Sequence, residues 1–154
     1  MSKIEIGRKA PDFSLDGTRG AWSLKDAAGA PVVLYFYPRD NTPGCTKEGE
    51  DFTKAHAQFK KSGTPIFGIS TDSVESHVKF KKKMAFAFEL LSDPDQRVCK
   101  LYDVIQEKNM YGKKYMGVER STFLIDAKGV LRQAWRKVKV NGHAEAVLAA
   151  VKAL

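Results

Sequence analysis

Cysteine is scarce in this 154-residue chain, which contains only Cys45 and Cys99. Two cysteines cannot build the disulfide framework that holds small secreted domains together. No other cysteine or histidine stands at the spacing of a zinc-binding motif. We therefore expect neither a metal nor a cofactor, and each thiol is either an inert core residue or a reactive group.

Long apolar stretches are absent as well. No run approaches the roughly 20 residues that a membrane helix needs, and residues 1–9 are polar, without the apolar core of a signal peptide. We find no internal repeat, low-complexity tract or linker. We expect a soluble cytoplasmic protein with no membrane partner, folded as one domain over residues 1–154.

Acidic residues are outnumbered, because 18 Asp and Glu face 26 Lys and Arg, which gives a formal net charge of +8. Such an excess could attract nucleic acid. The lysines are spread over several amphipathic segments, however, and no nucleic-acid-binding motif accompanies them. We expect a solvated basic surface and no nucleic-acid partner. A non-enzymatic basic binding or chaperone module is the alternative, and the charge is its only support.

Apolar and β-branched runs predict seven strands in addition to several helices. The strands cover residues 12–15 and 21–24, which form a hairpin around a Gly17–Gly20 turn, and then 32–37, 64–70, 88–91, 121–126 and 130–138. Helical spacing predicts helices from Cys45 to Ser62, over residues 74–84 with Val78 and Phe80 among the apolar residues, from Ser92 to about Tyr102, and over residues 143–154. Residues 106–119 form a polar, glycine-containing segment without an assigned element.

The order of these elements indicates the fold class. An opening of alternating strands and helices is typical of parallel strands with helices on both faces. A closing hairpin and helix, together with the N-terminal hairpin, make this a thioredoxin-like α/β fold with a central mixed sheet flanked by helices.

The loop before Cys45 is the first candidate site. In α/β domains, functional groups gather where a strand ends and the next helix begins. Cys45 would lie in the first turn of that helix, where free N–H groups and the helix dipole favour a thiolate. A small buried hydrophobe is the alternative role, but the flanking residues Thr42-Pro43-Gly44 and Thr46-Lys47-Glu48 are polar.

The sequence around Cys45 resembles the peroxiredoxin motif Pro-x-x-x-Thr/Ser-x-x-Cys. The run YPRDNTPGCTKE is similar to the peroxiredoxin Q branch, also called bacterioferritin comigratory proteins. The resemblance covers nearly the whole chain and includes four further segments: Gly7-x-x-Ala10-Pro11-Asp12-Phe13, Phe67-Gly68-Ile69-Ser70, Leu91-Ser92-Asp93-Pro94 and Arg120-Ser121-Thr122-Phe123-Leu124-Ile125-Asp126.

This resemblance implies a thiol-dependent peroxidase that reduces hydrogen peroxide and organic hydroperoxides. Cys45 is then the peroxidatic cysteine, which becomes a sulfenic acid. Thr42 corresponds to the hydroxyl that contacts peroxide and thiolate, and Arg120 to the guanidinium that holds both. Pro38 corresponds to the proline that shields the site, and Glu48 to a carboxylate that orients the arginine.

Other polar residues of the chain are given no catalytic role. We expect Arg39 and Asp40 on the surface of the loop. We expect His56, His77 and His143 at surface or boundary positions, because none stands beside a matching motif.

The sequence departs from the branch where a resolving cysteine often stands. That position holds Glu50, and the predicted helix over residues 74–84, the other known location, contains no cysteine. Only Cys99 remains, and we expect it to be a half-buried helical residue. It borders the apolar stripe of its own helix, which consists of Val98, Leu101, Tyr102 and Ile105. A disulfide would require its Cα within about 4.4–6.8 Å of that of Cys45.

We therefore predict a one-cysteine mechanism in a monomer, with thioredoxin, glutaredoxin or a small thiol as reductant. Resolution by Cys99 is the alternative mechanism. A thiol–disulfide oxidoreductase on the same fold would need a second cysteine three residues after Cys45, where Glu48 stands.

Overall fold

The computed structural model describes residues 4–154, so residues 1–3 of the polar N-terminal segment lie outside it. Within the described part of the chain, no helix is both long and apolar enough to cross a membrane. The elements along the chain are β1 (Ser14–Gly17), β2 (Gly20–Ser23), a 3-10 turn (Leu24–Ala27), β3 (Val32–Phe36), α1 (Pro43–Lys61), β4 (Ile66–Ser70), α2 (Val74–Met84), β5 (Glu89–Ser92), α3 (Arg97–Leu101), β6 (Ile105–Met110), β7 (Lys113–Val118), β8 (Ser121–Ile125), β9 (Leu131–Trp135) and α4 (His143–Lys152).

A seven-stranded mixed sheet forms the centre, with the strand order β2-β1-β5-β4-β3-β8-β9. Strands β3, β4 and β5 run parallel to one another. Strand β1 pairs antiparallel with β5, and β8 pairs antiparallel with β3. This arrangement and the N-terminal β1–β2 hairpin confirm the predicted thioredoxin-like architecture.

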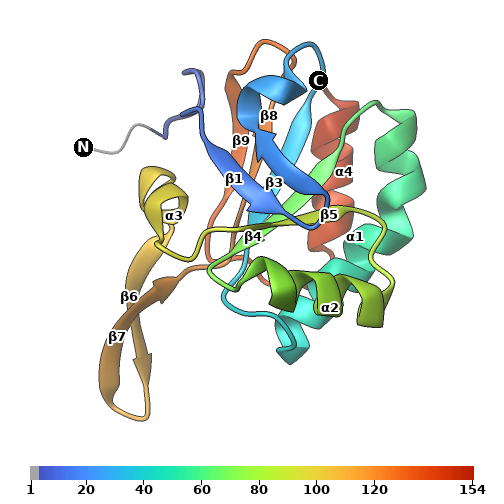
Figure 1. Cartoon of the computed structure of the whole chain (residues 1–154). Helices are drawn as coiled ribbons and strands as arrows, with labels where there is room; N and C mark the ends of the chain where they lie inside the picture. Colours follow the sequence, from blue (N-terminus) through green and yellow to red (C-terminus); the bar gives the residue numbers. More distant parts are fainter. Residues whose placement is uncertain (1–3) are drawn as a thin grey trace.

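The central strand β3 is buried on both faces, as expected for an apolar run in the middle of an α/β sheet. Its alternate side chains enter two separate cores. Val33 and Tyr35 pack beneath α1, α2 and α4, whereas Leu34 and Phe36 pack on the opposite face with residues of α3 and the N-terminal hairpin. Figure 1 shows α1 and α4 side by side on one side of the sheet and α3 on the other.

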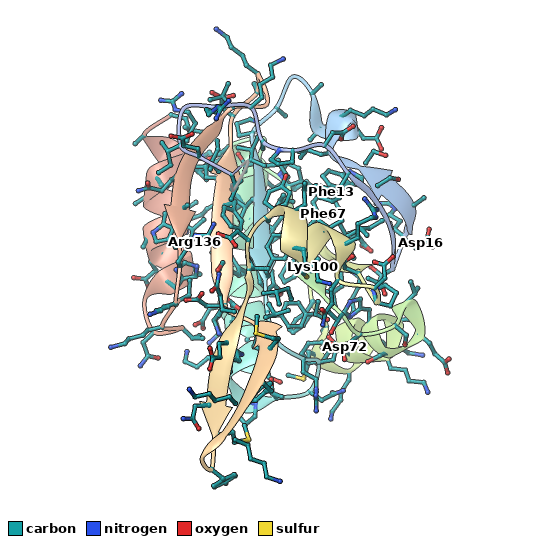
Figure 2. All side chains as sticks on the ribbon, turned by 90° about the vertical axis from the view of Figure 1, so that its left-hand side faces the viewer. Phe13, Asp16, Phe67, Asp72, Lys100 and Arg136 are labelled. Carbon is teal, nitrogen blue, oxygen red and sulfur yellow. The ribbon has the colours of Figure 1, made fainter. Side chains whose placement is uncertain are left out.

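Strands β6 and β7 form a separate two-stranded sheet, which extends away from the body of the molecule (Figures 1 and 2). The sequence pattern predicted only a polar segment here. The strands escaped detection because most of their side chains are exposed, so neither strand shows the alternation that a half-buried strand requires.

Two predicted helices are shorter in the structure. The predicted helix from Ser92 to Tyr102 is reduced to α3, because Ser92 still pairs with Ser70 in the sheet and Gln96 is left-handed (φ 63°). The C-terminal helix α4 ends at Lys152, and Leu154 is exposed. Helix α2 has the predicted bounds, with Phe80 buried and Val78 facing solvent.

Candidate active site

The loop between β3 and α1 carries most of the predicted site residues. Thr42 is extended (φ −87°, ψ 152°), in keeping with the restriction that a following proline imposes. Pro43 then opens α1, where its missing N–H leaves no hydrogen bond unmade. Cys45 is therefore the third residue of α1, in its first turn, and only 2% of the residue is exposed.

Arg120 reaches the Cys45 thiol from a distant part of the chain. It precedes β8, and the antiparallel pairing of β8 with β3 places Ser121 opposite Phe36. This register brings Arg120 beside the end of β3, where the loop begins. Its Nη2 donates a hydrogen bond to Cys45 Sγ at 3.4 Å. A guanidinium in this position stabilises negative charge on the sulfur.

Gly44 makes room for that guanidinium. A Cβ atom at this position would stand 3.0 Å from Arg120 Nη2, so a larger residue would press against the group that contacts Cys45. In the sequence, Gly44 stands out only as part of the motif before Cys45. Its packing role depends on where Arg120 lies, and no local pattern carries that information.

Glu48 holds the other arm of the guanidinium. Its Oε1 accepts from Arg120 Nη1 at 2.6 Å, and its side chain is 1% exposed. Its Oε2 is buried and has no hydrogen-bond partner among residues 4–154. Burial raises the pKa of Glu48 from 4.5 to about 7, although Arg120 opposes this shift. Glu48, Arg120 and Cys45 thus form one chain of contacts.

Thr42 and Pro38 are both half-buried residues of the same loop. The Thr42 hydroxyl donates to the carbonyl of Arg39 at 2.9 Å, so its proton is directed to the backbone. The oxygen can still accept a hydrogen bond from another group. Arg39 itself is exposed, as expected.

Asp40 was expected on the loop surface, and this expectation is wrong. The residue is buried, and its Oδ1 accepts from the Tyr37 hydroxyl at 2.6 Å. Its Oδ2 lies 2.8 Å from both Ser76 Oγ and His77 Nδ1. Because these partners lie at the end of β3 and in α2, the carboxyl group fastens the loop to α2.

His77 was expected at a surface or boundary position but is fully buried, because its side of α2 packs against the sheet. Its second ring nitrogen, Nε2, lies 2.9 Å from the carbonyl oxygen of Leu91. Asp40, Asp72 and His77 lie close enough together to be possible metal ligands, a grouping that the sequence did not reveal. Their atoms already make hydrogen bonds, since Asp72 Oδ2 accepts from the Asp40 backbone at 2.8 Å. We read the cluster as a structural network.

His143 is the second histidine for which the expected surface or boundary position is wrong. It is buried at the start of α4, and its Nε2 lies 2.8 Å from Thr122 Oγ1. Burial, and to a smaller extent Arg120, lower the pKa of His143 to about 4. Its position was missed because Phe52 and Trp135, which pack around it, come from distant elements. His56 is half-buried, in agreement with the expectation.

Cys99 lies in the core on the opposite face of the sheet from Cys45. It is fully buried rather than half-buried, because α3 packs against that core through Val98 and Cys99. Burial first, and then the charge of Asp93, raise the pKa of the Cys99 thiol well above its usual range. The structure therefore does not bring the two thiols together.

Lys108 is a neighbour of the site that sequence analysis did not single out. It is half-buried in β6, and burial and then Arg120 lower its pKa, while the Cys45 sulfur acts in the opposite direction. Strand β7 ends two residues before Arg120, which contacts Cys45, so the base of the β6–β7 hairpin lies beside the site. A lysine in a polar segment carries no signal that could have shown this.

The fold and the site define a class of protein: a thioredoxin-like domain with a buried thiol at a helix start, held by a guanidinium. Residues 6–134 match the model of the AhpC/TSA family. The chain belongs to this family, and within it to the peroxiredoxins of the Bcp or PrxQ type, so it is a thiol-dependent peroxidase.

Relatives match along almost the full chain. Peroxiredoxin Bcp of Xanthomonas campestris pv. campestris is 57% identical over 151 residues, covering 97% of this chain and 94% of that protein. A structure of the Xanthomonas campestris bacterioferritin comigratory protein, studied for alkyl peroxide reduction, is 51% identical with a TM-score of 0.90 and covers 97% of this chain and 98% of that one. A mutant of PrxQ from Xylella fastidiosa is 43% identical, with a TM-score of 0.93 and coverage of 99% and 98%.

Proposed function

We propose that Cys45 is the thiol with which this peroxidase reduces hydrogen peroxide and organic hydroperoxides. The observation that carries the proposal is the hydrogen bond from Arg120 Nη2 to Cys45 Sγ at 3.4 Å. The study of alkyl peroxide reduction by the Xanthomonas campestris protein supports organic hydroperoxides as substrates.

The chemical step is a two-electron transfer from sulfur to oxygen. The Cys45 thiolate attacks the terminal oxygen of the hydroperoxide, an S–O bond forms, and the O–O bond breaks. Sulfur is oxidised to a sulfenic acid, while the leaving oxygen takes a proton and departs as water or an alcohol. Negative charge moves from sulfur to oxygen during this step, so a donor that reaches both atoms lowers the barrier.

We assign the neighbouring residues to supporting roles in that step. The Arg120 guanidinium spans thiolate and peroxide, and Glu48 orients it through the contact at 2.6 Å. The Thr42 oxygen accepts a hydrogen bond from the peroxide, and the hydroxyl can do this while it still donates to the Arg39 carbonyl. To donate to the thiolate instead, the hydroxyl must turn away from that carbonyl. Pro38 shields the thiol from water.

We propose a one-cysteine mechanism in which an external thiol reduces the sulfenic acid. The position of Cys99 in the other core favours this over an internal disulfide, which would require the sheet itself to be disrupted. Thioredoxin, glutaredoxin and small thiols are the candidate reductants. A thiol–disulfide oxidoreductase is disfavoured by Glu48, which stands where a second cysteine would be needed.

We further propose that the protein acts in the cytoplasm as a monomer and that residues 1–154 work as one domain. Two unpaired cysteines suit a reducing compartment. Outside the β6–β7 hairpin, the exposed large hydrophobic side chains of the described residues are isolated ones: Ile6, Val78 and Leu154. Both cores pack on one sheet, which favours a single cooperative unit.

The decisive test is oxidation of the reduced protein with one equivalent of peroxide, followed by trapping and peptide mass spectrometry. We expect a sulfenic acid on Cys45 and a free thiol on Cys99. A disulfide between Cys45 and Cys99 would overturn the one-cysteine mechanism. Failure of the protein to consume peroxide with dithiothreitol would overturn the larger proposal, and the basic binding module would then be the better explanation.

A further inference from the structure

We infer that one face of the β6–β7 hairpin is the docking surface for a protein dithiol whose reactive thiol lies in acidic and apolar surroundings. This inference rests on the proposed function, because a one-cysteine peroxidase must receive its reducing thiol at Cys45 from another molecule. It adds the surface on this chain that such a molecule contacts and the chemistry of that molecule.

The base of the hairpin adjoins the site. Strand β7 ends at Val118, and the chain then passes through Glu119 to Arg120, the residue that donates to the Cys45 sulfur. At its base the hairpin is anchored by a hydrogen bond from the Glu119 N–H to the Val104 carbonyl at 2.7 Å. A macromolecule that brings a thiol to Cys45 therefore comes close to the base of the hairpin.

The strand register divides the hairpin into two faces, because residues directly opposite one another in an antiparallel pair share a face. One face contains Lys108 opposite Tyr115 and Met110 opposite Lys113. We call this the near face, because Lys108 is half-buried whereas Glu107 and Asn109 on the other face are exposed. Lys108 also interacts electrostatically with Cys45 and Arg120. The far face contains Glu107 opposite Met116 and Asn109 opposite Lys114.

Exposed apolar side chains are concentrated on this hairpin. Among the described residues, four of the seven large hydrophobic side chains that are exposed belong to it: Met110, Tyr111, Tyr115 and Met116. Tyr111, at the tip, is 99% exposed. Of these, Met110 and Tyr115 lie on the near face, Met116 lies on the far face and Tyr111 is at the tip. Exposed apolar side chains gathered in one place are typical of an interaction site, and tyrosine and methionine are enriched in such sites.

The charges of the near face indicate the partner. Lys108 and Lys113 lie on it, and its remaining positions, Gln106 and Gly117, are uncharged. On the far face, Lys114 is paired with Glu107 at 3.6 Å, so its charge is partly compensated. A basic and apolar near face is complementary to a partner with acidic and apolar residues around its thiol. Small, short-lived contacts of this kind are typical of redox partners.

The reaction at this interface balances without any further reactant. The partner's thiolate attacks the Cys45 sulfenic sulfur, an S–S bond forms, and the S–O bond breaks so that the oxygen leaves as water after taking a proton. The partner's second thiol then displaces Cys45 as thiolate. Two electrons pass from the dithiol to Cys45, and the partner leaves as a disulfide.

The test compares substitutions on the two faces with two reductants. The near-face variant combines Met110→Ser, Lys113→Glu and Tyr115→Ser, and the matched far-face control combines Lys114→Glu and Met116→Ser. All of these residues are exposed, so both variants should fold. Steady-state peroxide reduction is measured with dithiothreitol and, separately, with thioredoxin, its reductase and NADPH.

We expect the near-face variant to raise KM for thioredoxin about tenfold, the change that corresponds to losing about 1.4 kcal/mol of binding. Its rate with dithiothreitol and its kcat at saturating thioredoxin should stay within twofold of the unaltered protein. The far-face control should change neither value. For the unaltered protein, KM for thioredoxin should rise at 0.5 M salt, whereas the dithiothreitol rate should not.

Equal effects of the two variants, or no change in KM, would overturn the inference. Turnover with dithiothreitol but with neither thioredoxin nor glutaredoxin would also overturn it and would leave the proposed peroxidase intact. Loss of turnover with dithiothreitol in the unaltered protein would instead contradict the proposed function. If the unaltered protein sediments as a dimer and the near-face variant sediments as a monomer, the occupant of the near face is a second copy of this chain. That outcome would also overturn the inference.

Discussion

The two cysteines occupy closely matched positions on opposite faces of the sheet. Helix α1 begins Pro43-Gly44-Cys45 and helix α3 begins Arg97-Val98-Cys99, so each sulfur belongs to the third residue of its helix. Both residues are buried, and each follows a loop that contains a buried aspartate. Position in a helix and burial therefore do not distinguish them.

The difference lies in the charge that faces each sulfur. Arg120, just before β8, donates to Cys45, whereas Asp93 turns its carboxylate toward the start of α3 and accepts from the backbone of Val98 and Cys99 at 3.2 and 2.7 Å. The aspartate before Cys45, Asp40, is directed away to His77 and α2. A neighbouring cation favours a thiolate, and a neighbouring anion opposes it.

The strongest test of this comparison removes each sulfur in turn. We expect Cys45→Ser to reduce peroxide consumption with dithiothreitol by at least about 10³-fold, because a catalytic nucleophile is lost. The matched variant Cys99→Ser should retain a rate within about twofold. Substantial peroxide consumption by Cys45→Ser would contradict the assignment of the two thiols.

The second test removes the cation. Arg120→Met should lower the peroxidase rate by roughly 10²- to 10³-fold, the usual cost of losing one preorganised donor in a transition state. Arg120→Lys should recover little of this loss, since an ammonium group cannot contact Glu48 and Cys45 through two arms. Circular dichroism provides the folding control, and a rate near that of the unaltered protein would exclude the guanidinium from the reaction.

The third test removes the anion beside Cys99. Asp93→Ala should lower the free energy of unfolding by about 1–2 kcal/mol, because the α3 backbone loses its cap. The peroxidase rate should remain unchanged, since Asp93 acts on the other face of the sheet. Urea denaturation and the dithiothreitol assay measure the two quantities on the same sample. A fall in rate at constant fold would show that the two faces are coupled.

The smallest effect concerns Glu48, whose pKa of about 7 lies above its ordinary value of 4.5. At a pH between these values, Glu48 is protonated in the folded protein and ionised in the unfolded chain. Its contribution to the free energy of unfolding therefore decreases as pH rises from about 4.5 to 7.

The same titration affects the peroxidase rate. As pH falls through 7, Glu48 loses the charge that attracts Arg120. That charge contributes about 1 kcal/mol to the hydrogen bond, or roughly fivefold in rate.

Comparison with Glu48→Gln isolates this titration from all others. The rate of the unaltered protein divided by the rate of Glu48→Gln should fall between pH 8 and pH 6. Over the same range, the unfolding free energy of the unaltered protein relative to Glu48→Gln should rise. A rate ratio that is constant with pH would show that the charge of Glu48 does not act through Arg120.

Much of the fold could be predicted because the deciding patterns are local. The apolar run of β3 and the break at Ser62 and Gly63 each depend on neighbouring residues alone. The motif from Pro38 to Cys45 lies within one loop, so it too could be recognised. Arg120 was found only through a resemblance, since nothing local distinguishes it from any other arginine.

By itself, the sequence determined the order of the main elements and the place of Cys45 at a helix start, because backbone preferences and apolar spacing are local properties. It indicated the family through the resemblance of its motifs. Tertiary structure alone decided that Asp40 and His77 are buried, that Cys99 lies in the other core and that residues 105–118 form a hairpin beside the site. Burial and charge proximity depend on which distant segments pack together, and strand register rather than local pattern determines that.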